Sequence, residues 1–184
     1  MQLETCVEKF LNGEKAYFNI LVQQLQRPIY TLSLRMTGDA EMAKDLTQDI
    51  FLKVYKNLAS YNNSVKITTW IYTIATNTCI DYLRKKKDIL LFDDHQQAEF
   101  EQQTYDLPGH ALENRELRRH IYEKIDCLPE HYRIVVILKY INELSFEEIS
   151  LILNQPVNTV KTKLYRAKDI LKTHLADTWI EWSV

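Results

Sequence analysis

Polar and basic side chains gather near the C-terminal end of the sequence, where they could bind nucleic acid. A helix predicted after Pro156 would place Val160 on its inner face and, on its outer face, Asn158, Lys161, Thr162, Tyr165 and Arg166. Lysine and arginine bind phosphates and guanine edges, while short Asn and Thr side chains can approach bases closely. This face is therefore suited to the major groove of duplex DNA.

The residues before this helix indicate a helix-turn-helix. Ser145 and Glu148 have the spacing of a capping box, which predicts a short helix that buries Phe146, Ile149 and Leu153. The polar turn at 154–156 contains a proline and separates it from the longer basic helix. The alternative is an ordinary solvated face on an amphipathic helix, but that alternative explains neither the turn nor the short helix.

A second group of side chains is acidic and amide-bearing, with one leucine among them. Leu46 and Ile50 would face the core of a predicted helix, and the outward side would then hold Asp45, Gln48, Asp49 and Leu52. Such a surface could dock a partner helix, because the leucine would anchor it and the carboxylates would accept charge-assisted hydrogen bonds. From the residues alone, a solvated face with an incidental leucine is the simpler interpretation.

The third group lies on a helix predicted from Thr69 to Lys87. Trp70 and Tyr72 stand near its start, Asn77 and Asp81 share a polar stripe, and a basic run at 84–87 ends it. Aromatic rings beside basic and amide groups favour single-stranded DNA, whose unstacked bases stack on rings while its backbone follows positive charge. The alternative is that both rings belong partly to the core.

The elements that must position these groups are helices. Three glycines and four prolines in 184 residues are too few for the turns of an all-β chain. Helical spacing is lost between residues 88 and 112, where acidic and glutamine side chains dominate. The sequence therefore predicts an all-α protein: an N-terminal helical domain at 1–87, an acidic linker at 88–112, and a C-terminal helix-turn-helix domain at 113–184.

Composition argues against several other classes of protein. The net charge of −2 hides two basic helices on either side of an acidic connector. Three widely spaced cysteines and five scattered histidines give no pattern typical of a zinc site or a catalytic centre, so we expect no enzyme, metal or cofactor. We also expect no signal peptide and no membrane span, and a cytoplasmic location.

Five segments together resemble the sigma-70 family, and most closely its extracytoplasmic-function (ECF) branch. The N-terminal segments are DLTQDIFLK at 45–53, TWIYTIATN at 69–77 and IDYLRK at 80–85. The C-terminal segments are LPEHYR at 128–133 and PVNTVKTK at 156–163. The resemblance runs in order from about residue 14 to residue 175. Asn158 stands where the family often has glycine, and Trp179 and Trp182 lie in a tail outside the pattern.

The resemblance implies a promoter-recognition factor for RNA polymerase, with promoter DNA and core polymerase as its partners and no small-molecule substrate. Docking on the clamp helices of the β′ subunit, with further contact to the β subunit, would use Asp45, Gln48, Asp49 and Leu52. The melted −10 element would meet Tyr61, Asn62, Asn63, Lys66, Trp70, Asn77, Asp81, Arg84 and Lys85. The −35 element would meet Asn158, Lys161, Thr162, Lys163, Tyr165 and Arg166.

The same resemblance implies control by a separate anti-sigma factor, often tethered to the membrane, and an acidic linker that threads toward the polymerase active site. A free-standing helix-turn-helix regulator is the alternative. That regulator would bind duplex DNA without polymerase, and its N-terminal domain would need a ligand pocket or a dimer seam.

Overall fold

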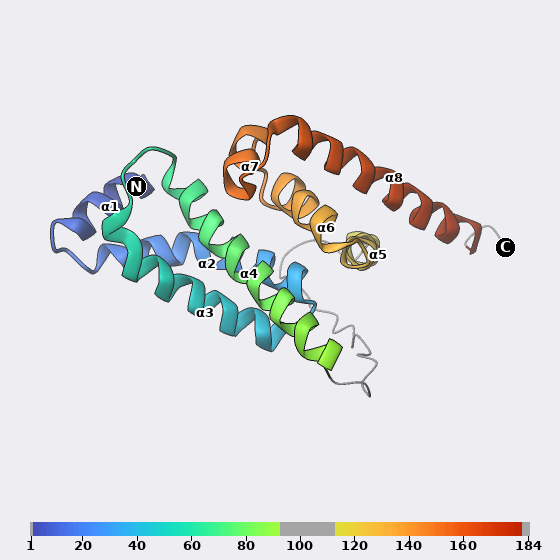
Figure 1. Ribbon diagram of the computed structural model, residues 1–184, viewed down its shortest axis with the longest axis horizontal. Coiled ribbons are helices and arrows are strands. Elements are labelled where there is room, and N and C mark those ends of the chain that lie inside the picture. Colours follow the sequence, from blue (N-terminus) through green and yellow to red (C-terminus); the bar gives the residue numbers. More distant parts are fainter. Residues whose placement is uncertain (1, 93–112, 182–184) are drawn as a thin grey trace.

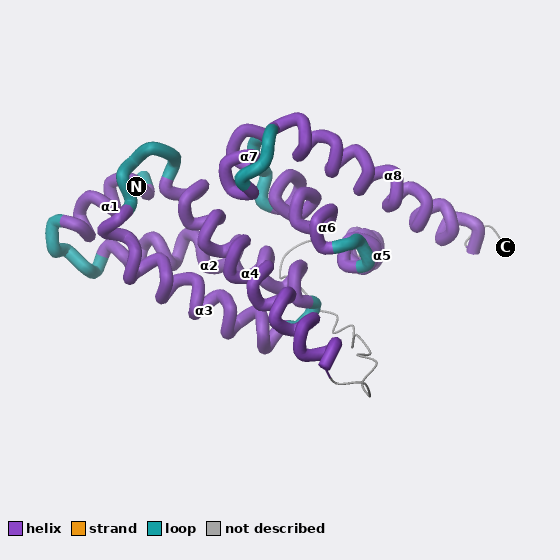
Figure 2. The backbone as a smooth tube through the Cα atoms, viewed as in Figure 1, coloured by secondary structure: helices purple, strands orange, loops and turns teal. Residues whose placement is uncertain are grey.

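The computed structural model describes residues 2–92 and 113–181, and within them every regular element is a helix (Figures 1 and 2). The predicted all-α class is confirmed. The residues at 93–112, which make up most of the predicted linker, and Trp182 lie outside the described part of the chain.

The N-terminal half contains four α-helices and one short 3₁₀ turn. In chain order these are α1 (Leu3–Leu11), α2 (Tyr17–Thr37), α3 (Ala40–Asn57), η1 (Leu58–Ser60) and α4 (Ile67–Phe92). Helix α2 packs against α1, α3 and α4, so it lies at the centre of this half. The first helix, α1, was not predicted from the sequence.

Helix α2 owes its central place to a continuous apolar stripe. Leu21, Leu25, Ile29, Leu32 and Met36 recur at intervals of three or four residues, and all are buried. Pro28 lies inside this helix and does not begin a new one. The helix ends at Gly38, whose φ of 68° is in the left-handed region that glycine adopts without a steric penalty.

Helix α3 begins at Ala40, because Asp39 caps it. The Asp39 carboxylate accepts a hydrogen bond from the backbone N–H of Met42 at 3.1 Å. Leu46 and Ile50 are buried as predicted, and the same stripe also buries Ala43, Val54 and, just after the helix, Leu58. This burial leaves the opposite face of α3 available to solvent.

The C-terminal half contains the predicted helix-turn-helix. Its elements are α5 (Glu113–Asp126), α6 (Glu130–Val136), a π-helical turn η2 (Ile137–Ile141), α7 (Phe146–Leu153) and α8 (Val157–Glu181). The capping box is present, because Ser145 accepts from the Glu148 N–H and Glu148 accepts from the Ser145 N–H. Asn154 ends α7 in the left-handed conformation, with φ of 49°, which turns the chain into α8.

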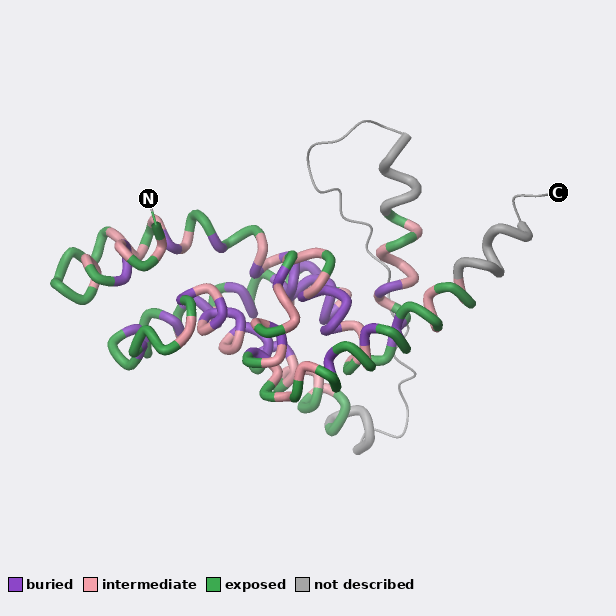
Figure 3. The backbone as a smooth tube through the Cα atoms, turned by 90° about the horizontal axis from the view of Figure 1, so that it is seen from above, coloured by how far each residue is buried: buried purple, intermediate pink, exposed green. Residues whose placement is uncertain are grey.

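The two halves pack against each other. Helix α7 lies on α4, and α5, α6 and η2 contact α2. One cluster of buried side chains runs through both halves, from Ile29 and Ile71 to Val135 and Ile149, so the buried stretches of the two halves meet in the interior (Figure 3). Helix α4 also continues five residues beyond the predicted domain boundary at Lys87.

Candidate polymerase-binding and nucleic-acid-binding surfaces

The outward side of α3 presents a partly acidic surface with an apolar centre, which we call the α3 face (Asp45, Gln48, Asp49 and Leu52). Asp45 and Gln48 are exposed, and Asp49 is half-buried and pairs with Lys53 at 2.8 Å. Leu52 is 57% exposed, although Leu46 and Ile50 on the same helix are buried. An exposed leucine bordered by carboxylates and an amide could bind a partner helix.

The loop between η1 and α4 is held in place by Tyr61. This side chain is only 8% exposed; its hydroxyl donates to the Val65 carbonyl at 2.7 Å, and its ring lies 5.6 Å from the Trp70 ring. Tyr61 therefore supports the loop from inside. Asn62 and Asn63 are exposed at its tip, where Asn63 adopts a φ of 57°.

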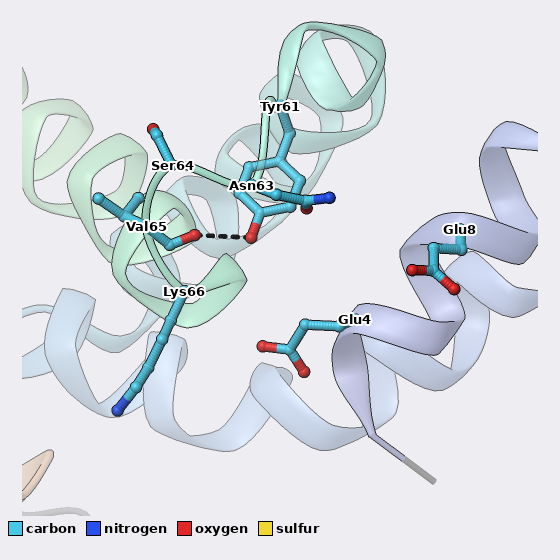
Figure 4. A pocket seen from close by; sticks show the side chains of 7 residues that line it. All are labelled: Glu4, Glu8, Tyr61, Asn63, Ser64, Val65 and Lys66. Atoms are coloured by element: carbon cyan, nitrogen blue, oxygen red, sulfur yellow. Dashed lines mark hydrogen bonds between the residues drawn. The ribbon is translucent and has the colours of Figure 1, made fainter.

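This loop and α1 line an open pocket of about 400 Å³ (Figure 4). Glu4 and Glu8 line it from α1, and Asn63, Ser64 and Lys66 line it from the loop, together with Tyr61 and Val65. Glu4 and Glu8 were not predicted from the sequence to belong to a site. Their separation of four residues, which puts both on one face of a helix, is the signal that could have identified them.

Lys66 reaches from this loop to the other half of the molecule. Its ammonium donates to the Glu148 carboxylate at 2.9 Å. The hydrogen bond to Glu148 raises the pKa of Lys66, and the same contact, with the backbone N–H of Ser145, lowers the pKa of Glu148. The capping carboxylate of α7 thus also connects the two halves.

The two aromatic rings near the start of α4, Trp70 and Tyr72, differ in how far they are buried. Trp70 is half-buried, with part of the ring accessible. Tyr72 is only 5% exposed, and its hydroxyl accepts a hydrogen bond from the Asn142 side-chain amide at 2.9 Å. Of the two alternatives weighed for Tyr72, burial in the core is therefore the one that holds, because α7 packs on α4 and Asn142 reaches the Tyr72 hydroxyl.

Further along α4, the polar side chains that were selected from the sequence point to solvent. The exposed members are Asn77, Asp81, Arg84 and Lys85. Arg84 donates to Asp81 at 2.7 Å, an exposed pair that adds little to stability. These groups continue the surface that begins at Trp70 and the loop, and we call the whole the loop–α4 surface (residues 61–66, Trp70 and the exposed side of α4).

Helix α8 turns its basic face away from the core, which we call the α8 face. Val160 is buried as predicted, and Leu164 and Ala167 are buried on the same side of the helix. The exposed side chains are Asn158, Lys161, Thr162, Tyr165 and Arg166, and Lys163 is half-buried. Tyr165 is 68% exposed, so most of its ring is accessible to solvent.

The described residues contain neither a cluster of metal-ligating side chains nor a helix apolar and long enough to cross a bilayer.

Two protein families match this chain, one in each half. The family described as Sigma-70 region 2 matches residues 21–89, which include the α3 face and all but the last three residues of α4. The family described as Sigma-70, region 4 matches residues 118–171, which include the helix-turn-helix.

Comparison with whole proteins extends this likeness to nearly the full length. The ECF RNA polymerase sigma factor SigW of Bacillus subtilis is 38% identical over 184 residues, covering 96% of this chain and 98% of the relative. The ECF RNA polymerase sigma-E factor of Escherichia coli K12 is 29% identical, covering 91% of each chain.

Solved structures share the fold. The sigma factor RpoE of Bartonella quintana, in complex with the anti-sigma factor NepR, has a TM-score of 0.72 at 19% identity, over 86% of this chain and 96% of that one. CnrH in complex with the cytosolic domain of CnrY has a TM-score of 0.70 at 16% identity, over 94% of this chain and 96% of that one. On the shared sequence families and the 38% identity to SigW, the chain belongs to the ECF sigma factors of the sigma-70 family.

Proposed function

We propose that this chain binds core RNA polymerase through the α3 face and directs it to promoters by contacts from the loop–α4 surface and the α8 face. It acts by binding and positioning, and performs no covalent chemistry. The observation that carries the proposal is that three exposed surfaces, each with a different chemistry, occur on one chain of this family. We retain the division into 1–87, 88–112 and 113–184 as the functional units.

The α3 face fits docking to the clamp helices of the polymerase β′ subunit. Leu52 offers an apolar side chain that is still largely exposed to water, so its burial against a partner would be favourable. Asp45 and Gln48 are free to accept or donate hydrogen bonds around it. The ring of polar groups around an apolar centre is the usual organisation of a protein interface.

The loop–α4 surface fits the melted non-template strand of the −10 element. Asn62 and Asn63 at the loop tip could hydrogen-bond to base edges, and the accessible part of Trp70 could stack on an unpaired base. Arg84 and Lys85 would follow the strand backbone. In this proposal Tyr61 acts from inside the loop and holds its shape.

The α8 face fits the major groove of the −35 element. The second helix of a helix-turn-helix contacts bases mainly through residues of its first turns, which here carry Asn158, Lys161 and Thr162. Lys163, Tyr165 and Arg166 continue the face one turn further and are placed to contact phosphates or neighbouring bases.

We further propose that an anti-sigma factor controls this chain by covering these surfaces. Among solved structures with the same fold, one is a sigma factor in complex with the anti-sigma factor NepR, and another is CnrH in complex with the cytosolic domain of CnrY. The chain itself would act in the cytoplasm, where its polymerase is.

Gel filtration of the purified chain with purified bacterial core polymerase tests the proposal. We expect the two to elute together, and the doubly substituted variant Asp49→Ala with Leu52→Ala to elute separately while keeping its helical circular dichroism. Binding to duplex DNA in the absence of any interaction with core polymerase would instead favour a free-standing regulator.

A further inference from the structure

Three lysines rest on two aromatic rings beside the α8 face. The ammonium groups of Lys139 and Lys161 lie 4.7 and 5.4 Å from the centre of the Phe146 ring. The Lys168 ammonium lies 5.3 Å from the centre of the Tyr140 ring, and Tyr140 follows Lys139 in η2. We call this group the lysine row (Lys139, Lys161 and Lys168 on the rings of Tyr140 and Phe146). Of its members, only Lys161 also belongs to the α8 face.

Three elements build the lysine row. Lys161 and Lys168 are seven residues apart on α8, so they lie on one side of the helix and about 10.5 Å apart along its axis. Each residue turns the helix by about 100°, so Lys161 lies roughly a quarter turn from Thr162 and the row borders one edge of the α8 face. The rings come from η2 and from Phe146, the first residue of α7, because α6 and α7 pack against α8.

The positive charges of the lysine row have no acidic partner in the part of the chain that the structure describes. Glu143, Glu147 and Asp169 adjoin the row in sequence, and no ion pair joins any of them to it. Two of the three ammonium groups share one ring, so like charges lie close together without a counter-charge. Like charges repel, and a bound anion would remove that repulsion.

The rings hold the ammonium groups in place without hiding them. An aromatic face attracts a lysine cation that lies within about 6 Å of its centre. A side chain that already rests on a ring loses less rotamer freedom on binding than a free lysine does. Tyr140 is 51% exposed, and Lys161 and Lys168 are exposed as well. Lys139 is fixed further by its hydrogen bond to the Leu144 carbonyl at 3.0 Å.

We propose that the lysine row binds the phosphates of one strand of duplex DNA, beside the groove that the α8 face enters, and so gives the chain affinity for duplex DNA of any sequence. This inference rests on the function proposed for the α8 face. A polyanion with evenly repeated charges fits a row of cations spread over two helical turns. Phosphate contacts carry no sequence information, so the row sets how tightly the chain holds DNA and the α8 face sets where.

Three variants and a control separate the charge of the row from its rings. Lys168→Gln removes one exposed charge. Lys172→Gln removes the same charge from another exposed lysine, one turn further along α8 and outside the row, and is the matched control. Tyr140→Leu removes a ring and keeps every lysine, whereas Tyr140→Phe keeps the ring and removes only its hydroxyl.

The measurement is binding of the full-length chain to fluorescent DNA duplexes of three unrelated sequences, between 50 and 200 mM salt. Each phosphate contact contributes about 0.9 to the slope of log affinity against log salt. If the contact acts only by releasing counterions, Lys168→Gln should bind about 15-fold less tightly at 50 mM salt and about 5-fold less tightly at 150 mM. The same factors should hold for all three sequences, and Lys172→Gln should follow the wild type.

The ring variants test the positioning role. Tyr140→Leu should lower the affinity about two- to fivefold and leave the salt slope unchanged, because the lysine still reaches a phosphate but is no longer held. Tyr140→Phe should bind as the wild type does. Circular dichroism and urea unfolding check the fold of every variant. Wild-type affinity in a well-folded Tyr140→Leu would reduce the ring to a packing role.

Several results would overturn the lysine row as a DNA site. They are a wild type without salt-dependent binding to any duplex, equal affinities of Lys168→Gln and Lys172→Gln, and a loss confined to one sequence, which would indicate base contacts. Tighter binding to an RNA duplex of the same sequence would assign the row to RNA instead. None of these measurements involves polymerase, so a failed row leaves co-elution with core polymerase, and with it the proposed function, to be judged separately.

Discussion

Leu52 allows a prediction whose size follows from its exposure. Complete burial of a leucine side chain is worth about 1.5–3 kcal/mol, and 57% of this residue remains in contact with water. Docking on polymerase would therefore gain about 1–2 kcal/mol from this side chain. Leu52→Ala should weaken binding to core polymerase about 5- to 30-fold, because each 1.4 kcal/mol is a factor of ten.

The chain contains a matched control for this substitution. Leu151 on α7 is 56% exposed but lies outside the α3 face, so Leu151→Ala removes the same atoms at the same exposure. Binding of each fluorescently labelled variant to core polymerase can be measured by anisotropy, and stability by urea unfolding. We expect both variants to keep wild-type stability and only Leu52→Ala to lose affinity. Equal affinities for the two variants would refute the assignment of the α3 face.

Three further results are expected. Arg166→Ala should weaken binding to a −35 duplex by about 1–3 kcal/mol and reduce its salt dependence, whereas Lys172→Ala, further along α8, should change affinity far less in the same titration. Burial raises the pKa of Tyr72 from 10.0 to about 12. The contribution of the Tyr72 hydroxyl to the free energy of unfolding should therefore be constant below pH 10 and fall by about 2–3 kcal/mol as the pH rises through 12. Urea unfolding of Tyr72→Phe at these pH values should lack that component. Burial raises the pKa of the Cys79 thiol to about 11, so a thiol reagent at pH 8 should modify exposed Cys127 and reach Cys79 only after unfolding.

The features that could be predicted from the sequence are those decided by neighbouring residues. The capping box of Ser145 and Glu148 requires only a separation of three, and the buried stripe of α3 requires only helical spacing. The helix-turn-helix combines two such local signals with a short turn. These elements therefore agree with the structure in type and nearly in position.

Contacts between distant parts of the chain could not be predicted in this way. Arg35 and Asp126 are 91 residues apart, and no periodicity in either segment indicates that they meet. Tyr72 shares a helical turn with Trp70, and what buries it is the packing of the other half of the molecule on α4. Helix α1 has an apolar pattern at Leu3, Val7 and Phe10, which was too short to distinguish from chance.

In the proposed function, this chain enables core polymerase to start transcription at defined sites. Single-round transcription with purified core polymerase on fragments of bacterial genomic DNA measures this directly. We expect transcripts that require the chain and begin downstream of two shared sequence elements, and that are lost with Leu52→Ala combined with Asp49→Ala. Transcripts identical to those of core polymerase alone would contradict it.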